Sequence, residues 1–167
     1  MYEIICYKTR QKLGEPVRVV PVWNSGVKVD ENIDFLDMRE IVKVMCDDKI
    51  AIHENTTEFT YIVCLNSAGQ ITGLAEISKG NLKESYITPS DVLQHAILLN
   101  SRYVVMVHNH PNNVLAASEG DLKVVKILLK AFDEMHIYFM DSIIITEKNV
   151  SYSIRSNYPE IWDVEED

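Results

Sequence analysis

Two histidines, a serine and an aspartate stand close together in the 167-residue chain, with spacings that suit a metal site. His108 and His110 end a run of β-forming residues, and side chains two apart point to the same face of an extended chain. Asp121 lies one turn into the helix expected after Ser118, so its carboxylate can reach the same point. Two neutral imidazoles and one carboxylate are ligands of a catalytic zinc whose fourth position is left for water. The spacing therefore predicts a zinc site.

A second interpretation of these residues needs no metal. Ser118 and Asp121 match a capping box, in which a serine and an acidic residue three positions later satisfy the first amides of a helix. Residues 108–111, His-Asn-His-Pro, would then be a polar loop. This interpretation explains the helix start but leaves both histidines without a role. The two are compatible, and we favour the zinc site.

A zinc hydrolase also needs a carboxylate near the metal that takes a proton from water. Spacing alone does not choose this residue among the 25 acidic residues. Four glutamates lie upstream near the ends of expected strands, and an isolated glutamate in such a place is usually only solvated. The candidates left open are Glu54, Glu58, Glu76 and Glu84.

Composition restricts the class of protein. The length suits one domain, and 47% hydrophobic with 25% charged residues is an ordinary globular balance. A net charge of −9 disfavours DNA binding through this domain alone. We find no signal peptide, lipidation motif or membrane-spanning run, so we expect a cytoplasmic protein with no membrane partner. Three cysteines without C-x-x-C spacing are expected to be reduced core thiols: Cys6, Cys46 and Cys64.

The elements expected after residue 50 follow the order β-β-α-β-α-β-β, which is typical of an α/β domain with a mixed sheet flanked by helices. Strands are expected at 58–66, 71–78, 103–107, 137–146 and 151–154. Of these, 103–107 is almost wholly apolar and is expected to be central and buried on both faces.

Two helices lie between these strands. One is expected over 118–135 and one over 89–100, which Thr88 would cap before a proline at the first helical position. The core side of the helix at 89–100 is expected to include Val92, Leu93, Ala96 and Ile97.

The ends of the chain are less clearly patterned. Strands are expected at 2–8 and 17–23, with a break at Gly14-Glu15-Pro16 and a turn at Asn24-Ser25-Gly26. A helix is expected over 35–47 with Asp34 as its cap. Residues 156–167 resemble a frayed acidic tail, which Trp162 could dock.

The chemistry-bearing residues resemble a known signature. His-x-His, seven residues, Ser, two residues, Asp is the pattern of the JAMM (JAB/MPN) metalloproteases, and it occurs here in His108, His110, Ser118 and Asp121. The flanking VVMVHNHP, with MDSIIIT downstream, resembles the RadC-like branch. The implied fold is the JAB/MPN fold, a cytidine deaminase-like mixed β-sheet flanked by helices. We expect 1–50 to be an N-terminal extension packed on the core, 51–155 the RadC-like domain and 156–167 the tail.

The resemblance implies roles for individual residues. His108, His110 and Asp121 would bind Zn²⁺, and Ser118 would hydrogen-bond the tetrahedral oxyanion or its water. Glu58 stands seven residues before the leucine of a Leu-Asn pair, which is the position of the general base in that branch. The implied activity is hydrolysis of an amide or isopeptide bond in a protein or peptide.

Some positions depart from the branch's usual pattern. Asn112-Asn113 replace a usual Ser-Gly, Ala117 a proline, Ser90 an arginine, and Ser142 a histidine. The short N-terminal part also has no counterpart of the helix-hairpin-helix element that often precedes this domain. These departures keep open an alternative, a non-catalytic MPN-type binding module associated with DNA repair or processing machinery. The oligomeric state stays open.

Overall fold

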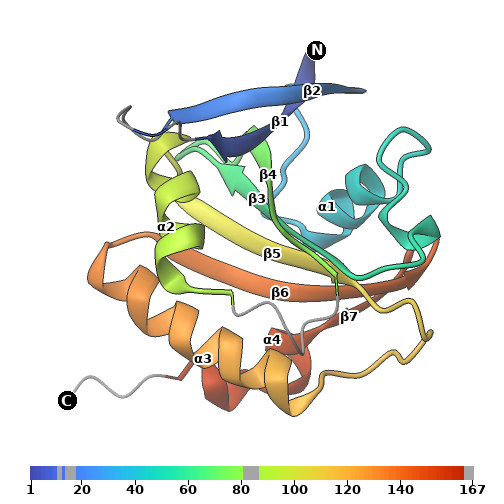
Figure 1. The fold of residues 1–167 in the computed structure, drawn as a ribbon, viewed down its shortest axis with the longest axis vertical. Helices are drawn as coiled ribbons and strands as arrows, with labels where there is room; N and C mark the ends of the chain where they lie inside the picture. The colour runs from blue at the N-terminus through green and yellow to red at the C-terminus, as the bar shows by residue number, and fades with distance from the viewer. Residues whose placement is uncertain (11–12, 14–17, 81–86, 164–167) are drawn as a thin grey trace.

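A seven-stranded mixed sheet runs through the molecule, with strand order β2-β1-β4-β3-β5-β6-β7 (Figure 1). The structure is a computed structural model, and it describes residues 1–10, 13, 18–80 and 87–163. The strands are β1 (Tyr2–Arg10), β2 (Arg18–Val29), β3 (Phe59–Leu65), β4 (Ile71–Lys79), β5 (Tyr103–Asn109), β6 (Tyr138–Glu147) and β7 (Val150–Ser153). The helices are α1 (Met38–Met45), α2 (Pro89–Leu98), α3 (Glu119–Glu134) and α4 (Ile154–Asn157), with single 3₁₀ turns at Ile52–Glu54 and Pro159–Ile161.

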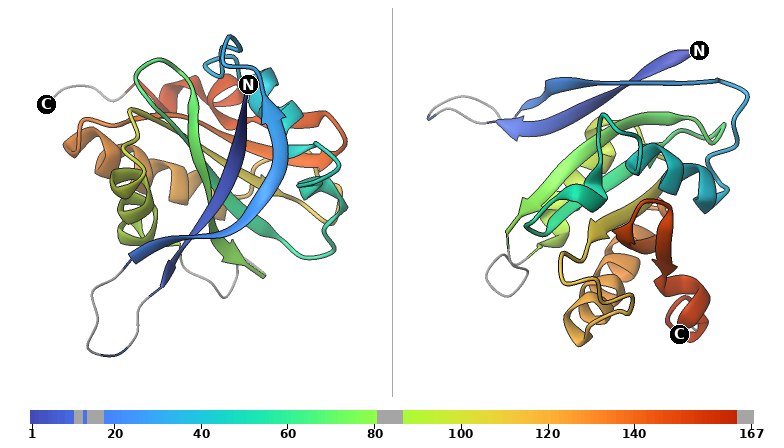
Figure 2. Two further views of the ribbon diagram at one scale, coloured as in Figure 1. Left: turned by 90° about the horizontal axis from the view of Figure 1, so that it is seen from above. Right: turned by 90° about the vertical axis from the view of Figure 1, so that its right-hand side faces the viewer.

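Helices cover both faces of the sheet, which confirms the predicted fold class and the element order after residue 50. Helix α1 packs on one face, while α2, α3 and α4 pack on the other. Figure 2 shows the β1–β2 pair at the edge of the molecule opposite α3 and α4. Strand β5 lies between β3 and β6, and each of Val104, Val105, Met106 and Val107 is at most 2% exposed. A strand buried on both faces reads as a continuous apolar run, as observed.

Strand pairing places the start of β3 beside the end of β5. These two strands are antiparallel, and Thr60 pairs with His108. The residue that precedes β3, Glu58, therefore lies next to the chain that leaves β5. Strand β6 is parallel to β5, so α3 connects the end of β5 back to the start of β6. The N-terminus of α3 consequently lies at the same end of the central strands as Glu58.

The predicted turn at Asn24-Ser25-Gly26 is wrong, because β2 continues through these residues as a bulged strand. The register with β1 shifts between Glu3 and Ile5, and Gly26 adopts a φ of 71° in the left-handed region that glycine favours. The Ser25 hydroxyl donates to the Ile4 carbonyl at 2.6 Å and fixes the bulge. The break predicted at 14–16 lies outside the described residues.

Helix α1 begins three residues later than predicted. Asp37, not Asp34, is its N-cap, and its side chain accepts from the Arg39 amide. Asp34 instead accepts from the Leu36 amide at 2.9 Å, which closes a local turn before the helix. Phe35 is 1% exposed, so it contributes to the core from this turn. Either aspartate could cap a helix, and the burial of Phe35 in the turn that follows Asp34 leaves Asp37 as the N-cap.

Two further predictions about packing are wrong. Ile97 is 49% exposed, whereas His95 on the same helix is buried, so the core side of α2 is rotated towards Val92, His95 and Ala96. The C-terminal segment is ordered as far as Trp162 and is not a frayed tail there. The indole Nε1 of Trp162 donates to the Phe139 carbonyl at 3.0 Å. The last four residues lie outside the described part.

The remaining predictions concern the thiols and the domain division. All three cysteines are free and buried, as expected of core thiols. The division at residues 50 and 155 stays a prediction, since one sheet and its two cores extend across both positions. Within the described residues, no helix is long and apolar enough to cross a membrane.

Candidate metal centre

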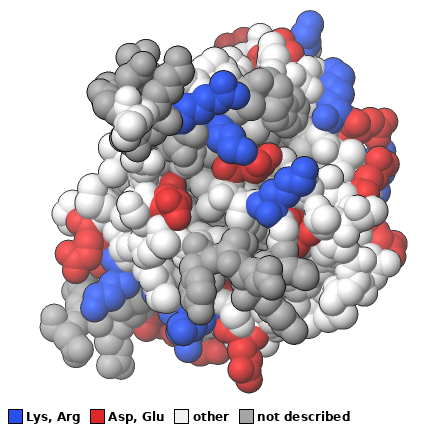
Figure 3. Space-filling view, in the orientation of Figure 1, with Lys and Arg blue, Asp and Glu red and all other residues white. Residues whose placement is uncertain are grey.

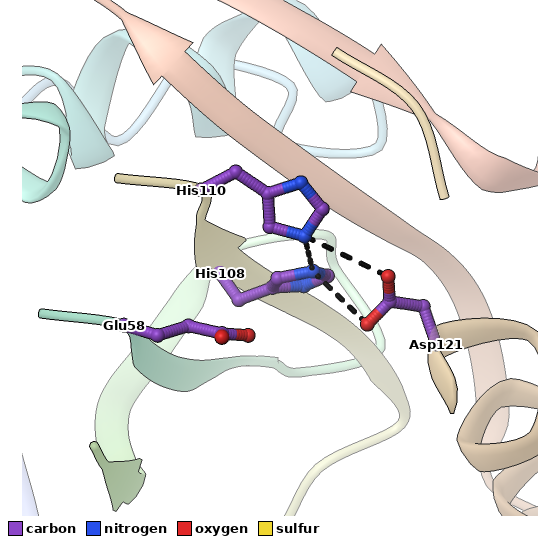
Figure 4. A group of neighbouring side chains, drawn as sticks. All are labelled: Glu58, His108, His110 and Asp121. Carbon is purple, nitrogen blue, oxygen red and sulfur yellow. Dashed lines mark hydrogen bonds and ion pairs between the residues drawn. The ribbon is translucent and has the colours of Figure 1, made fainter. Parts of the chain in front are cut away.

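Four side chains from three parts of the chain converge at the end of β5 (Figure 4). Glu58 precedes β3, His108 is on β5, His110 follows it, and Asp121 is in the first turn of α3. Each offers a nitrogen or oxygen ligand atom, and these atoms all lie within 4.8 Å of one another. The structure thus brings together both predicted histidines, the predicted aspartate and one of the four candidate glutamates.

The two histidines point their Nε2 atoms into the centre. These nitrogens are 3.1 Å apart, because residues 108 and 110 share one face of the strand. The other ring nitrogen of His110, Nδ1, lies 2.8 Å from the Val114 carbonyl oxygen. A carbonyl only accepts, so Nδ1 carries the hydrogen, and Nε2 of the neutral ring keeps a free lone pair. That lone pair is the one that a metal ion requires.

The capping box and the ligand arrangement occur together. The Ser118 amide and hydroxyl both donate to Asp121 Oδ2 at 2.7 Å, and the Asp121 amide donates back to Ser118 Oγ at 3.2 Å. Asp121 Oδ1 lies 3.4 Å from His108 Nε2, and Oδ2 lies 3.6 Å from His110 Nε2. The cap therefore orients the carboxylate towards both imidazoles, and the two interpretations of the sequence are compatible.

The centre keeps its carboxylate ionised although it is buried. His108 is 1% and Asp121 3% exposed. Burial by itself would raise the pKa of Asp121, but its polar contacts with His108, His110 and Ser118 hold that pKa far below its ordinary value. Burial by itself would lower the pKa of His110, whereas the Asp121 carboxylate and the Val114 carbonyl outweigh it and raise the pKa. The two imidazoles and the Ser118 hydroxyl thus stabilise the negative charge of Asp121.

The donor set fits a transition metal. Calcium and magnesium prefer all-oxygen sites, while two imidazole nitrogens with a carboxylate suit zinc. The cluster can therefore hold a metal ion through His108, His110 and Asp121, with Glu58 close enough to act on a molecule bound there.

Two of the other candidate glutamates, Glu54 and Glu76, do not belong to the cluster. Glu54 is exposed and lies 3.9 Å from His53, and Glu76 on β4 forms an ion pair with Lys8 at 3.1 Å. Glu84 lies outside the described residues. Sequence spacing could not identify the glutamate of the cluster, because its identity depends on which strand end lies beside β5.

The structure also places the positions that depart from the branch pattern. Asn113 adopts a φ of 57°, where the usual glycine is favoured and asparagine is among the best-tolerated alternatives. Ala117 directly precedes the α3 cap, and Ser90 lies in the first turn of α2. Ser142 on β6 is fully buried, and its hydroxyl has no hydrogen-bond partner in the described part of the chain. None of these four residues supplies a candidate ligand.

One residue at the centre was missed by the sequence argument. Asn109 lies between the two histidines, is 1% exposed and points to the opposite face of β5. Its amide makes three hydrogen bonds to the segment that contains Glu58. A buried polar residue between two candidate ligands at a strand end was the available signal.

Charge on the surface is mixed. On the face in Figure 3, acidic and basic side chains are interspersed, and the described residues form no broad basic surface there.

The chain is similar to known proteins over much of its length. A model of the RadC-like JAB domain matches residues 35–158. The UPF0758 protein of Finegoldia magna is 30% identical over 128 residues, which cover 77% of this chain and 56% of that protein. The UPF0758 protein of Chlorobium phaeovibrioides is 33% identical over 106 residues, covering 64% of this chain and 47% of that protein. The chain spans about half the length of the curated relatives it matches.

Proposed function

Because the chain belongs to the RadC-like JAB domain family, we propose that it is a zinc-dependent hydrolase of JAMM type that cleaves an amide or isopeptide bond in a protein or peptide. The observation that carries the proposal is the convergence of Glu58 with His108, His110 and Asp121 at the end of β5. A set of two imidazoles and two carboxylates close to one point, with His108 and Asp121 buried, suits metal-assisted hydrolysis.

Each residue has a role in this proposal. His108 and His110 hold the zinc through Nε2, and Asp121 holds it through a carboxylate oxygen. When bound, zinc supplies Lewis acidity that polarises a carbonyl and makes water a nucleophile near neutral pH. Glu58 takes a proton from the attacking water and delivers it to the leaving nitrogen. Ser118 orients Asp121 and presents a hydroxyl that can donate to the oxyanion developing on the substrate.

A cytoplasmic location is part of the same proposal. Three buried free thiols are typical of proteins from a reducing environment, which supports a cytoplasmic hydrolase.

The test compares wild type with Glu58→Gln on a panel of fluorogenic peptides and lysine-linked isopeptides, with added zinc. The substitution keeps the side-chain size but removes the base, so zinc should stay bound while turnover is lost. A Glu58→Gln protein that still cleaves at the wild-type rate would contradict the assignment of the base.

A non-catalytic MPN-type module associated with DNA repair or processing machinery is the second candidate, favoured by the altered positions Ser90, Ala117 and Ser142. Bound zinc without cleavage of any panel member would support the module. Binding of DNA that weakens steeply with salt would support its nucleic-acid version.

A further inference from the structure

Asn109 connects the two zinc-ligand candidates to the segment that carries Glu58. Its Oδ1 accepts from the Phe59 amide at 2.8 Å. Its Nδ2 donates to the Thr57 carbonyl at 3.0 Å and to the Asn55 carbonyl at 3.2 Å. A single buried side chain therefore binds the backbone on both sides of Glu58.

The hydrogen bonds of Asn109 continue the connection between β3 and β5 beyond the last paired residues. The β3–β5 ladder stops at the Thr60–His108 pair, and the His110 amide already donates to the Ile145 carbonyl of β6 at 3.1 Å. The chain that leaves β5 thus stays with β6. The Phe59 amide bonds the Asn109 side chain, which extends the connection between the two strands by one further residue.

Side chains alternate between the two faces of β5, so Asn109 lies between the two candidate histidine ligands but on the other face. His108 and His110 point to the metal side of β5, while Asn109 between them points to the other side. A shift of the Glu58 backbone away from the two imidazoles would lengthen the hydrogen bonds that Asn109 makes on both sides of Glu58. A displacement of about 1 Å at a reacting group can lower a rate by roughly 100-fold, so such a connection matters for a base.

We propose that Asn109 is a positioning residue, which holds Glu58 at a fixed distance from His108 and His110. This inference rests on the proposed function, in which Glu58 acts on a molecule at the metal. Asn109 itself is not a candidate ligand, because it points to the opposite face of the strand from His108 and His110.

The chain offers a matched control at the other end of β3. The Asn66 side chain also makes three hydrogen bonds across a turn, accepting from the Ala68 and Gln70 amides and donating to Gln70 Oε1. Asn66→Ala therefore removes a comparable set of bonds far along β3 from the centre. Effects shared by Asn66→Ala and Asn109→Ala report stability, and effects of Asn109→Ala alone report positioning.

The experiment uses cobalt in place of zinc, since the visible spectrum of cobalt(II) reports its surroundings without any substrate. Wild type, Glu58→Gln, Asn109→Ala and Asn66→Ala are each loaded with cobalt. All four should bind the metal, because the three ligands are unchanged. Glu58→Gln and Asn109→Ala should shift the absorption bands in the same direction, and Asn66→Ala should match wild type. Hydrogen exchange of the Phe59 amide should be accelerated in Asn109→Ala only.

The outcomes separate the two claims. A wild-type spectrum for Asn109→Ala, with a shifted one for Glu58→Gln, would overturn the positioning role and leave Glu58 as the base. An equal shift in Asn66→Ala would overturn it too, by showing a general effect of destabilisation. An unchanged spectrum for Glu58→Gln would contradict the role of Glu58 and the positioning role with it. Asn109→Asp keeps the shape and the acceptor for Phe59, so it replaces Asn109→Ala if that variant does not fold.

Discussion

Ser118 has two roles in this structure, and one substitution can measure both. It caps α3, and its hydroxyl also donates to Asp121 Oδ2 at 2.7 Å. Ser118→Ala removes both contacts. Thr88→Ala is the matched control, because Thr88 caps α2 in the same way, accepting from the Asp91 amide at 3.3 Å and donating to Asp91 Oδ2 at 2.6 Å. Asp91 does not belong to the metal centre.

The two roles have separate magnitudes. Loss of an N-cap side chain costs about 1 kcal/mol, so both variants should lose this much stability without zinc. Loss of a hydrogen bond to a metal ligand weakens metal affinity by roughly 10–100-fold. At a free zinc concentration far above both dissociation constants, this ratio corresponds to roughly 1.4–2.7 kcal/mol of stability. With zinc, Ser118→Ala should therefore lose about 2.4–3.7 kcal/mol in total, and Thr88→Ala still about 1 kcal/mol.

Urea unfolding with and without buffered zinc measures these losses. The variants should show equal losses without zinc and different losses with it. If Ser118→Ala and Thr88→Ala lose the same stability in both conditions, Ser118 is only a helix cap. Its hydroxyl would then have no part in orienting a metal ligand.

Two predictions concern other parts of the fold. Burial raises the pKa of Asp141, although Ser153 and Arg155 hydrogen-bond its carboxylate. A folded pKa above the unfolded one stabilises the protein below the unfolded pKa, about 3.9, and the stabilisation is lost as the pH rises through the folded value. The stability of wild type relative to Asp141→Asn, measured by urea unfolding, should therefore fall as the pH rises above about 4; a constant difference would contradict this sign. Separately, a Cβ at Gly73 would lie 2.6 Å from Tyr7 Cε2, so Gly73→Ala should lower stability by about 1–3 kcal/mol, and Tyr7→Leu in the same chain should restore part of it. An unchanged urea midpoint for Gly73→Ala would contradict the close packing.

Hydrophobic periodicity and capping residues predict the structure correctly where contacts between neighbouring residues determine it. The apolar run of β5 and the Ser118 cap of α3 were predicted from residue types alone, and so were the positions of His108 and His110 on one face. These features depend on contacts within a few residues, which a sequence shows directly.

The errors arose where distant contacts decide. Asn-Ser-Gly at 24–26 has the composition of a turn, but pairing with β1 makes it a bulge. His95 is buried and Ile97 exposed because of how α2 is rotated on the sheet. Glu58 could not be chosen by spacing, since only the strand order places it beside β5; the resemblance supplied that choice.

Metal content tests the central claim most directly. We would purify wild type and His108→Ala without chelators or metal-affinity tags and measure bound metals by mass spectrometry. We expect one zinc per wild-type chain and none in His108→Ala, because loss of one of the three protein ligands removes most of the binding free energy. A wild-type protein that takes up no zinc at neutral pH, even when zinc is supplied, would contradict the account and leave the cluster as a helix cap beside a polar loop.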